Sequence, residues 1–120
     1  MKNLFPQLKQ YAEAQNEAVP KDSAIIVLMT KNGNMRHVIL PIFLEPESAA
    51  ASLKALLPQD DNTVSAAACF FSEGDLEIPA YAFRKVLVDL NDANLGTVIF
   101  MNGENGVISK PLSDTMPLCE

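Results

Sequence analysis

Apolar and polar residues follow two different periods along the chain, and the two periods predict helices in some segments and strands in others. Between residues 3 and 19 apolar side chains recur every three or four positions with charged residues on the opposite side, which is typical of an amphipathic helix. Pro6 stands in its first turn, where a missing N–H is harmless, and Pro20 ends it. The same spacing predicts helices over 49–57 and 79–90.

Runs of consecutive apolar residues predict the strands. Residues 23–30 and 35–44 flank a turn that contains Asn32-Gly33, and Asn-Gly between two apolar runs is a strong hairpin signal. A further strand is predicted over 63–71. The strands 97–101 and 107–110 flank a second turn rich in Asn and Gly, so they form a second hairpin. Pro41 lacks an N–H, so the second strand should lie at a sheet edge or bend there.

This order of elements predicts an α+β fold, in which three helices cover a mixed sheet of about five strands that contains two hairpins. With 120 residues the chain forms a single domain, and 110–120 is expected to be a flexible or extended tail. The residues predicted to form the core are Leu8, Tyr11, Ile25, Val27, Ile39, Phe43, Leu53, Leu56, Ala67, Cys69, Phe83, Leu87, Val98 and Phe100.

Composition and charge narrow the choice of partners. The chain is 48% apolar and 20% charged, with a net charge of −6, and its basic residues are scattered apart from one pair. A scattered positive charge on an acidic protein argues against nucleic acid as a partner. No apolar run approaches a membrane span and no signal sequence is evident, so a cytoplasmic protein with reduced thiols is expected.

Cys69 and His37 are the residues that a nucleophilic enzyme would have to use. His37 is the only histidine in the chain, and it lies in the second predicted strand. Cys69 lies in the third, within the apolar run that ends in two phenylalanines, where burial would raise its pKa and leave an inert thiol. Cys119, near the end of the chain, is expected to react readily. We therefore expect no catalytic thiol, with a Cys69/His37 pair as the enzyme alternative.

Clustered carboxylates are the other candidate for catalysis. Glu73, Asp75 and Glu77 alternate beside a turn and are expected to be solvated surface residues, although convergence in a cleft remains an alternative. Neither a zinc-ligand spacing nor a phosphate-binding glycine loop occurs in the chain. No metal or cofactor is therefore expected. Met101, Met116 and Leu118 are apolar candidates for a partner surface.

Two segments carry a resemblance to a known family. Residues 38–48, Val-Ile-Leu-Pro-Ile-Phe-Leu-Glu-Pro-Glu-Ser, run into the predicted helix 49–57 and resemble the strand and acidic helix start of the SseB-like amino-terminal domain (serine-sensitivity enhancer B). Phe83 to Leu90 followed by Leu95 to Gly103 is similar to the helix, strand and terminal asparagine of that family. The likeness covers about 24–108 and implies a small α+β interaction or regulatory domain without a recognised catalytic centre.

The residues and the resemblance together favour a non-catalytic domain that acts through a protein partner. Its charge of −6 favours a basic partner, and association with copies of itself stays open. Two alternatives remain. One is a small hydrolase or transferase that uses Cys69 and His37 or the clustered carboxylates, and the other is an acidic immunity or inhibitor protein.

Overall fold

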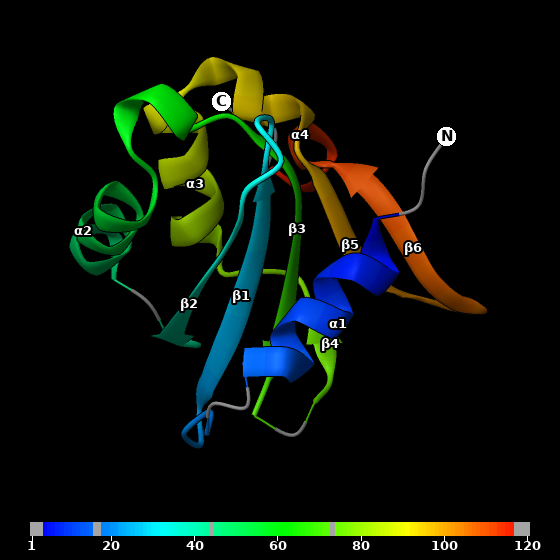
Figure 1. Cartoon of the computed structure of the whole chain (residues 1–120). Helices are drawn as coiled ribbons and strands as arrows, with labels where there is room; N and C mark the ends of the chain where they lie inside the picture. Colours follow the sequence, from blue (N-terminus) through cyan, green and yellow to red (C-terminus); the bar gives the residue numbers. More distant parts are fainter. Residues whose placement is uncertain (1–3, 16–17, 44, 73, 117–120) are drawn as a thin grey trace.

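A mixed sheet of six strands forms the centre of the protein, with helices on both of its faces (Figure 1). The computed structural model describes residues 4–15, 18–43, 45–72 and 74–116. The elements in chain order are α1 (Phe5–Gln15), β1 (Ser23–Thr30), β2 (Met35–Pro41), α2 (Pro46–Leu56), the 3₁₀ turn η1 (Gln59–Asp61), β3 (Val64–Phe71), β4 (Leu76–Glu77), α3 (Tyr81–Leu90), the 3₁₀ turn η2 (Asp92–Gly96), β5 (Val98–Gly103), β6 (Gly106–Pro111) and α4 (Leu112–Thr115).

The strand order across the sheet is β2-β1-β3-β5-β6, and β4 pairs with the end of β3. β1 pairs antiparallel with β2 and β3, and β5 pairs antiparallel with β6. Only β3 and β5 run parallel among the described strands, and the chain passes between them through α3. The predicted α+β class and mixed sheet are confirmed.

Both predicted hairpins form. Gly33 has φ +88°, which lets the turn after β1 close through a hydrogen bond from its N–H to the Thr30 carbonyl at 2.9 Å. Gly106 has φ +126° at the start of β6, directly after the second turn. Pro41 is the last residue of β2, on the outer strand of the sheet, which agrees with the edge position expected for a residue without an N–H.

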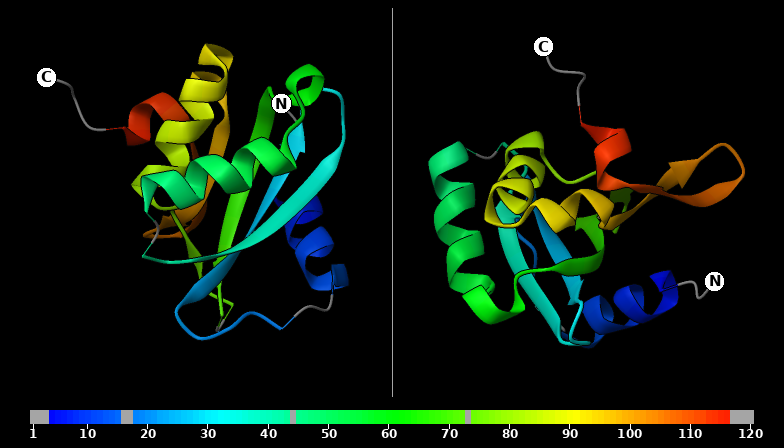
Figure 2. Two further views of the ribbon diagram at one scale, coloured as in Figure 1. Left: turned by 90° about the vertical axis from the view of Figure 1, so that its left-hand side faces the viewer. Right: turned by 90° about the horizontal axis from the view of Figure 1, so that it is seen from above.

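Figure 2 shows α2 and α3 on one face of the sheet and α1 on the other, and an apolar cluster packs against each face. Alternate residues of β1 divide between them, with Ile26 and Leu28 toward α2 and α3, and Ile25 and Val27 toward α1. Of the predicted core, nine residues are buried: Leu8, Ile25, Val27, Leu53, Ala67, Cys69, Phe83, Leu87 and Phe100. Four more are partly buried against the clusters: Tyr11, Ile39, Leu56 and Val98.

Phe43 was wrongly predicted to lie in the core, because it is 85% exposed. The predicted strand 35–44 ends early, at Pro41. Pro41 donates no hydrogen bond and the next helix begins at Pro46, so the chain leaves the sheet in between and carries Phe43 away from the core. Leu44, the last residue of that predicted strand, lies outside the described residues.

The structure also has elements that the periodicity did not predict. Two-residue β4 and four-residue α4 are too short to show a repeat. Lys110 and Pro111 complete β6, and Leu112 in α4 is fully buried, so this part of the expected tail is folded. Arg84 of α3 donates a hydrogen bond to the carbonyl of Thr115 and holds α4 in place. Residues 117–120 lie outside the described part. In the described segments no helix is long and apolar enough to cross a membrane.

Candidate functional site

His37 and Cys69 lie on opposite faces of the sheet. β1 lies between their strands and pairs with both, and its register places Val27 beside His37 and the preceding residue, Ile26, beside Cys69. Cross-strand partners share a face and successive residues of a strand alternate. The imidazole therefore projects toward the α1 side and the thiol toward α2 and α3, so the two do not form a Cys–His pair.

Cys69 is buried in the cluster under α2 and α3, with 2% of its surface exposed. Burial, and to a smaller extent the negative charge of Glu77, raises the pKa of its thiol to about 12. A thiol in this state is almost entirely protonated at neutral pH and makes a poor nucleophile. The predicted burial of Cys69 is confirmed, whereas Cys119 lies outside the described residues.

His37 connects β2 to the helix on the other face. The Tyr11 hydroxyl and His37 Nδ1 are hydrogen-bonded at 3.1 Å, and the centres of the two rings are 5.6 Å apart. Tyr11 lies on α1, so the contact helps to hold that helix against the edge of the sheet. This placement gives the histidine a structural role.

The structure describes two of the three alternating carboxylates, Asp75 and Glu77, and these two do not line a common hollow. Asp75 and Glu77 are both exposed, and Glu73 lies outside the described part. Glu77 belongs to β4 and pairs with Cys69 of β3, whereas Asp75 borders a shallow hollow together with Lys21 and Asp22. Solvated carboxylates of this kind contribute charge to the surface rather than acid–base chemistry.

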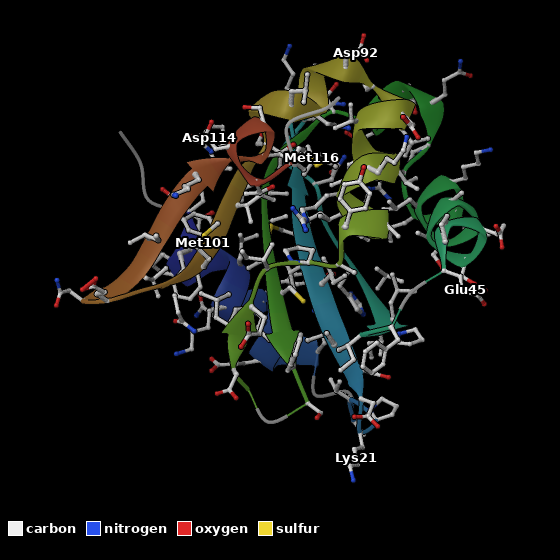
Figure 3. All side chains as sticks on the ribbon, turned by 180° about the vertical axis from the view of Figure 1, so that it is seen from behind. Lys21, Glu45, Asp92, Met101, Asp114 and Met116 are labelled. Atoms are coloured by element: carbon white, nitrogen blue, oxygen red, sulfur yellow. The ribbon has the colours of Figure 1, made fainter. Side chains whose placement is uncertain are left out.

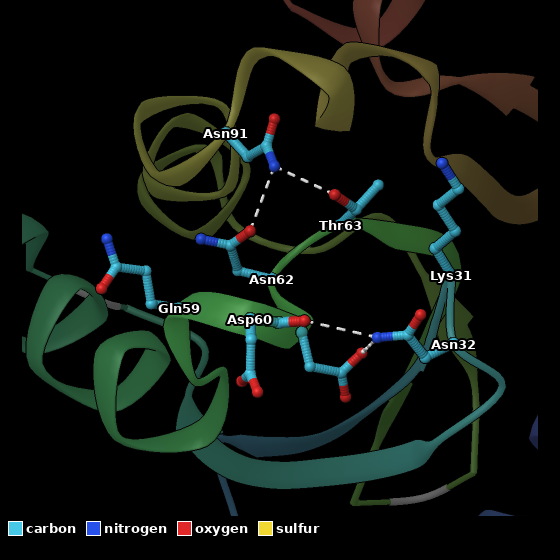
Figure 4. Close-up of a pocket in the computed structure, with 8 residues that line it drawn as sticks. Lys31, Asn32, Gln59, Asp60, Asn62, Thr63 and Asn91 are labelled. Carbon is cyan, nitrogen blue, oxygen red and sulfur yellow. Dashed lines mark hydrogen bonds between the residues drawn. The ribbon is translucent and has the colours of Figure 1, made fainter.

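A polar hollow of about 280 Å³ lies between the β1–β2 turn and the segment that leads into β3 (Figure 4). Asp61 is the centre of its hydrogen bonds and is 7% exposed. Asn34 donates to its carboxylate at 2.8 Å, and Arg36 and Asn32 each donate at 2.9 Å. The hydrogen bonds from Asn34 and then Arg36 lower the pKa of Asp61 to about 2.

The other wall of the hollow is also held by internal hydrogen bonds. The Asn91 amide donates to Asn62 at 3.0 Å and to Thr63 at 2.9 Å (Figure 4). Asn94 is fully buried just behind it, where its side chain accepts from the Val64 N–H at 2.7 Å and donates to the Leu87 carbonyl at 2.8 Å. The hydrogen bonds of these amides join segments about thirty residues apart in the chain. We therefore interpret the side chains around the hollow as a structural network that links these segments.

A small apolar hollow of about 70 Å³ opens at the opposite end of β1. Its lining includes Pro41, Ile42, Phe71 and Ile78, with Cys69 at its inner wall. Phe43 follows Ile42 directly and is 85% exposed, and Ile78 is 41% exposed. We define the apolar end as the five residues Pro41, Ile42, Phe43, Phe71 and Ile78.

Charged residues border the apolar end. Asp22, Asp75 and Lys21 line a neighbouring hollow that shares Ile42 and Phe71 with the apolar one. Glu45 lies beside the end of β2 (Figure 3), and Glu47 follows in the first turn of α2. Acidic groups therefore outnumber basic ones around this surface.

The apolar residues proposed from the sequence for a partner surface lie elsewhere. Met101 is 8% exposed and Met116 is partly buried beside α4 (Figure 3), whereas Leu118 lies outside the described residues. The sequence did not single out the exposed Phe43. Its one signal is the position between Pro41, which ends a strand, and Pro46, which starts a helix.

Comparison of the chain with models of known protein families finds no match, and comparison with curated proteins finds none either. Neither comparison therefore contributes to the inference about function. Among the described residues no group of three or more His, Cys, Asp or Glu side chains is placed to hold a metal ion.

Proposed function

We propose that the protein is a non-catalytic, protein-binding domain whose contact surface is the apolar end. The observation that carries this proposal is the 85% exposure of Phe43, which directly follows Ile42 in the lining of an apolar hollow. A buried Phe side chain contributes about 1.5–3 kcal/mol relative to an exposed one. Phe43 contributes almost none of that free energy to the stability of this fold. A partner that covers the ring would gain that free energy in the complex.

The surroundings of Phe43 support an anchor role. Energetically important interface residues are large side chains that become fully desolvated when a partner seals them off. Phe43 protrudes, and the hollow of about 70 Å³ lined by Ile42 and Ile78 can receive a small apolar side chain in return. An exposed apolar surface with a polar rim is typical of a protein interaction site.

Charge defines the class of partner. The net charge is −6, and Asp22, Asp75, Glu45 and Glu47 lie around or next to the apolar end. A partner that presents an apolar side chain within a basic surface complements it and is steered toward it. An acidic immunity or inhibitor role is the more specific form of this proposal and is supported by the same charge.

Two further points favour binding over catalysis. The separation of Cys69 and His37 by the sheet argues against a hydrolase or transferase that would use this pair. The resemblance of residues 24–108 to SseB-like domains, a family without a recognised catalytic centre, supports the same assignment.

The test is affinity capture from native cell extract with three baits: the unaltered chain, Phe43→Ser and Leu95→Ser. Leu95 is a matched control because it is an exposed apolar residue, at 41%, in η2. A specific partner should be recovered with the unaltered chain and with Leu95→Ser and be lost with Phe43→Ser. Raising the salt from about 0.15 M to 0.5 M should weaken the complex, since it screens the acidic rim.

Equal recovery of that partner with Phe43→Ser would exclude the apolar end as the contact surface. Turnover of a small molecule that is lost on replacing Asp75 and Glu77 would overturn the non-catalytic assignment.

A further inference from the structure

The hairpin of β5 and β6 projects from the body of the protein at one edge of the sheet (Figure 2). All six residues of β6 are exposed, and in the described part of the chain β6 pairs only with β5. An open strand edge with exposed apolar side chains is a template for pairing with another strand. Val107 and Ile108 are such side chains, with 45% and 41% of their surfaces exposed.

The register shows which backbone groups of β6 point outward. Gly103 pairs with Gly106 and Met101 with Ile108, and the ladder continues to Leu112, whose N–H donates to the Thr97 carbonyl at 2.7 Å. In an antiparallel pair, residues that bond to the neighbouring strand alternate with residues whose N–H and C=O face away. Leu112 bonds inward, so Ile108 and Lys110 do as well. The backbone N–H and C=O of Val107 and of Ser109 therefore point away from β5.

We propose that β6 pairs with β6 of a second copy of this chain, antiparallel and with Ile108 on the two-fold axis. Val107 then lies opposite the second copy's Ser109, and Ser109 opposite the second copy's Val107. Each of these pairs exchanges two hydrogen bonds, so every outward N–H and C=O of the two residues finds a partner. Pro111 has no N–H and ends the ladder.

The side chains are also self-complementary in this register. Cross-strand partners share a face of the sheet, so Ile108 contacts the second copy's Ile108 on the side of Met101. Ile108 is held in position because it lies over Gly103, where a Cβ would come within 2.7 Å of Ile108 Cγ2. Lys110 lies opposite the second copy's Gly106, next to the turn that carries Glu104, so the two opposite charges come within reach of each other.

These features favour a second copy over an unrelated peptide, since one short segment supplies both halves of every hydrogen bond and of the ion pair. They also favour β6 over the outer edge of β2. Met35 and Ile39 of β2 already pack against the cluster under α1, which leaves less apolar surface there for a partner to cover.

A contact of one short strand on each side falls in the small, transient class of interfaces. The dimer is therefore expected to form at protein concentrations of about 0.1 mM and above. The proposal is independent of the apolar end, so Phe43→Ser should dimerise like the unaltered chain.

The test is sedimentation equilibrium of purified protein from about 10 µM to 1 mM, with two sets of variants. Ser109→Pro removes an outward N–H without removing a hydrogen bond to β5, whereas the control Ser109→Thr keeps that N–H. The first should weaken dimerisation at least about tenfold and the second should leave it unchanged, and circular dichroism should show that both are folded. A monomer at every concentration, or equal dimerisation of both variants, would overturn the proposal.

The second set of variants reverses the charges of Lys110 and Glu104, first singly and then together. Lys110→Glu and Glu104→Lys should each weaken the dimer, and the double variant should restore it. Lys54→Glu on α2 and Glu13→Lys on α1 make the same changes of net charge at exposed positions and should have no comparable effect. Failure of the double variant to recover dimerisation lost in the single variants would contradict the register, and binding of added β6 peptide by a chain that stays monomeric would identify a foreign strand as the partner.

Discussion

Replacing Phe43 by Ser should weaken binding to the partner and leave the stability of the fold almost unchanged. Only about 15% of its surface is hidden, and since a fully buried Phe contributes about 1.5–3 kcal/mol, its share in this fold is below about 0.5 kcal/mol. Phe83 is the matched contrast because it belongs to α3 and is fully buried in the cluster between that helix and the sheet. Truncation to Ala there removes the transfer free energy and leaves a cavity, so the free energy of unfolding should fall by about 3–5 kcal/mol.

The two effects are measured by urea unfolding of Phe43→Ser and Phe83→Ala, followed by titration with the captured partner. Phe43→Ser should keep the urea midpoint of the unaltered chain but bind about thirtyfold more weakly, which corresponds to the roughly 2 kcal/mol of an anchor residue. A loss of more than about 2 kcal/mol in unfolding free energy would show that Phe43 packs inside the fold. Unchanged binding would refute its role as an anchor.

Three further outcomes follow from buried polar groups and the thiol. In a Cys119→Ser background, Cys69 should react with a thiol reagent only as fast as the protein unfolds, because its pKa is raised to about 12, and rapid modification in the native state would contradict this. The folded-state pKa of Asp61 is lowered from 3.8 to about 2, so its contribution to stability is present above pH 4 and is lost as the pH falls through 2. Asp61→Asn should therefore be less stable than the unaltered chain at pH 6 and equally stable near pH 2, and a constant difference between the two would refute it. Asn94→Leu should lower the unfolding free energy by about 2 kcal/mol or more, since it leaves the Val64 N–H buried without a partner and removes the hydrogen bonds to the Asn62 and Leu87 carbonyls, and an unchanged thermal midpoint would contradict this.

The fold was predictable where local pattern and tertiary structure agree. The run Ala24–Met29 is apolar throughout because β1 is an interior strand and is covered on both faces, and the two Asn/Gly turns need the positive φ that glycine supplies. The pairing of β3 with β5 was not predictable, since it depends on how α3 packs on the sheet rather than on any residue in either strand.

The polar network was missed for a related reason. Asn62, Asn91 and Asn94 are ordinary loop residues in the sequence, and their hydrogen bonds join segments about thirty residues apart. Asp61 likewise shows no local sign that Arg36 will reach it from β2. Such contacts exist only once the sheet has brought the β1–β2 turn beside the start of β3, so no spacing rule along the chain can reveal them.

Phe43 was predicted wrongly for a different reason: its local sequence pattern was clear, but it indicated a buried side chain. An apolar run from Val38 to Leu44 predicts burial only if the strand continues through it, and Pro41 and Pro46 mark where one element stops and the next begins. The described residues between those prolines belong to neither element, so nothing in the local backbone requires Phe43 to face the core. A large aromatic side chain held at that position gains most when another molecule covers it, and this is the physical reason to look for the partner of this protein at Phe43.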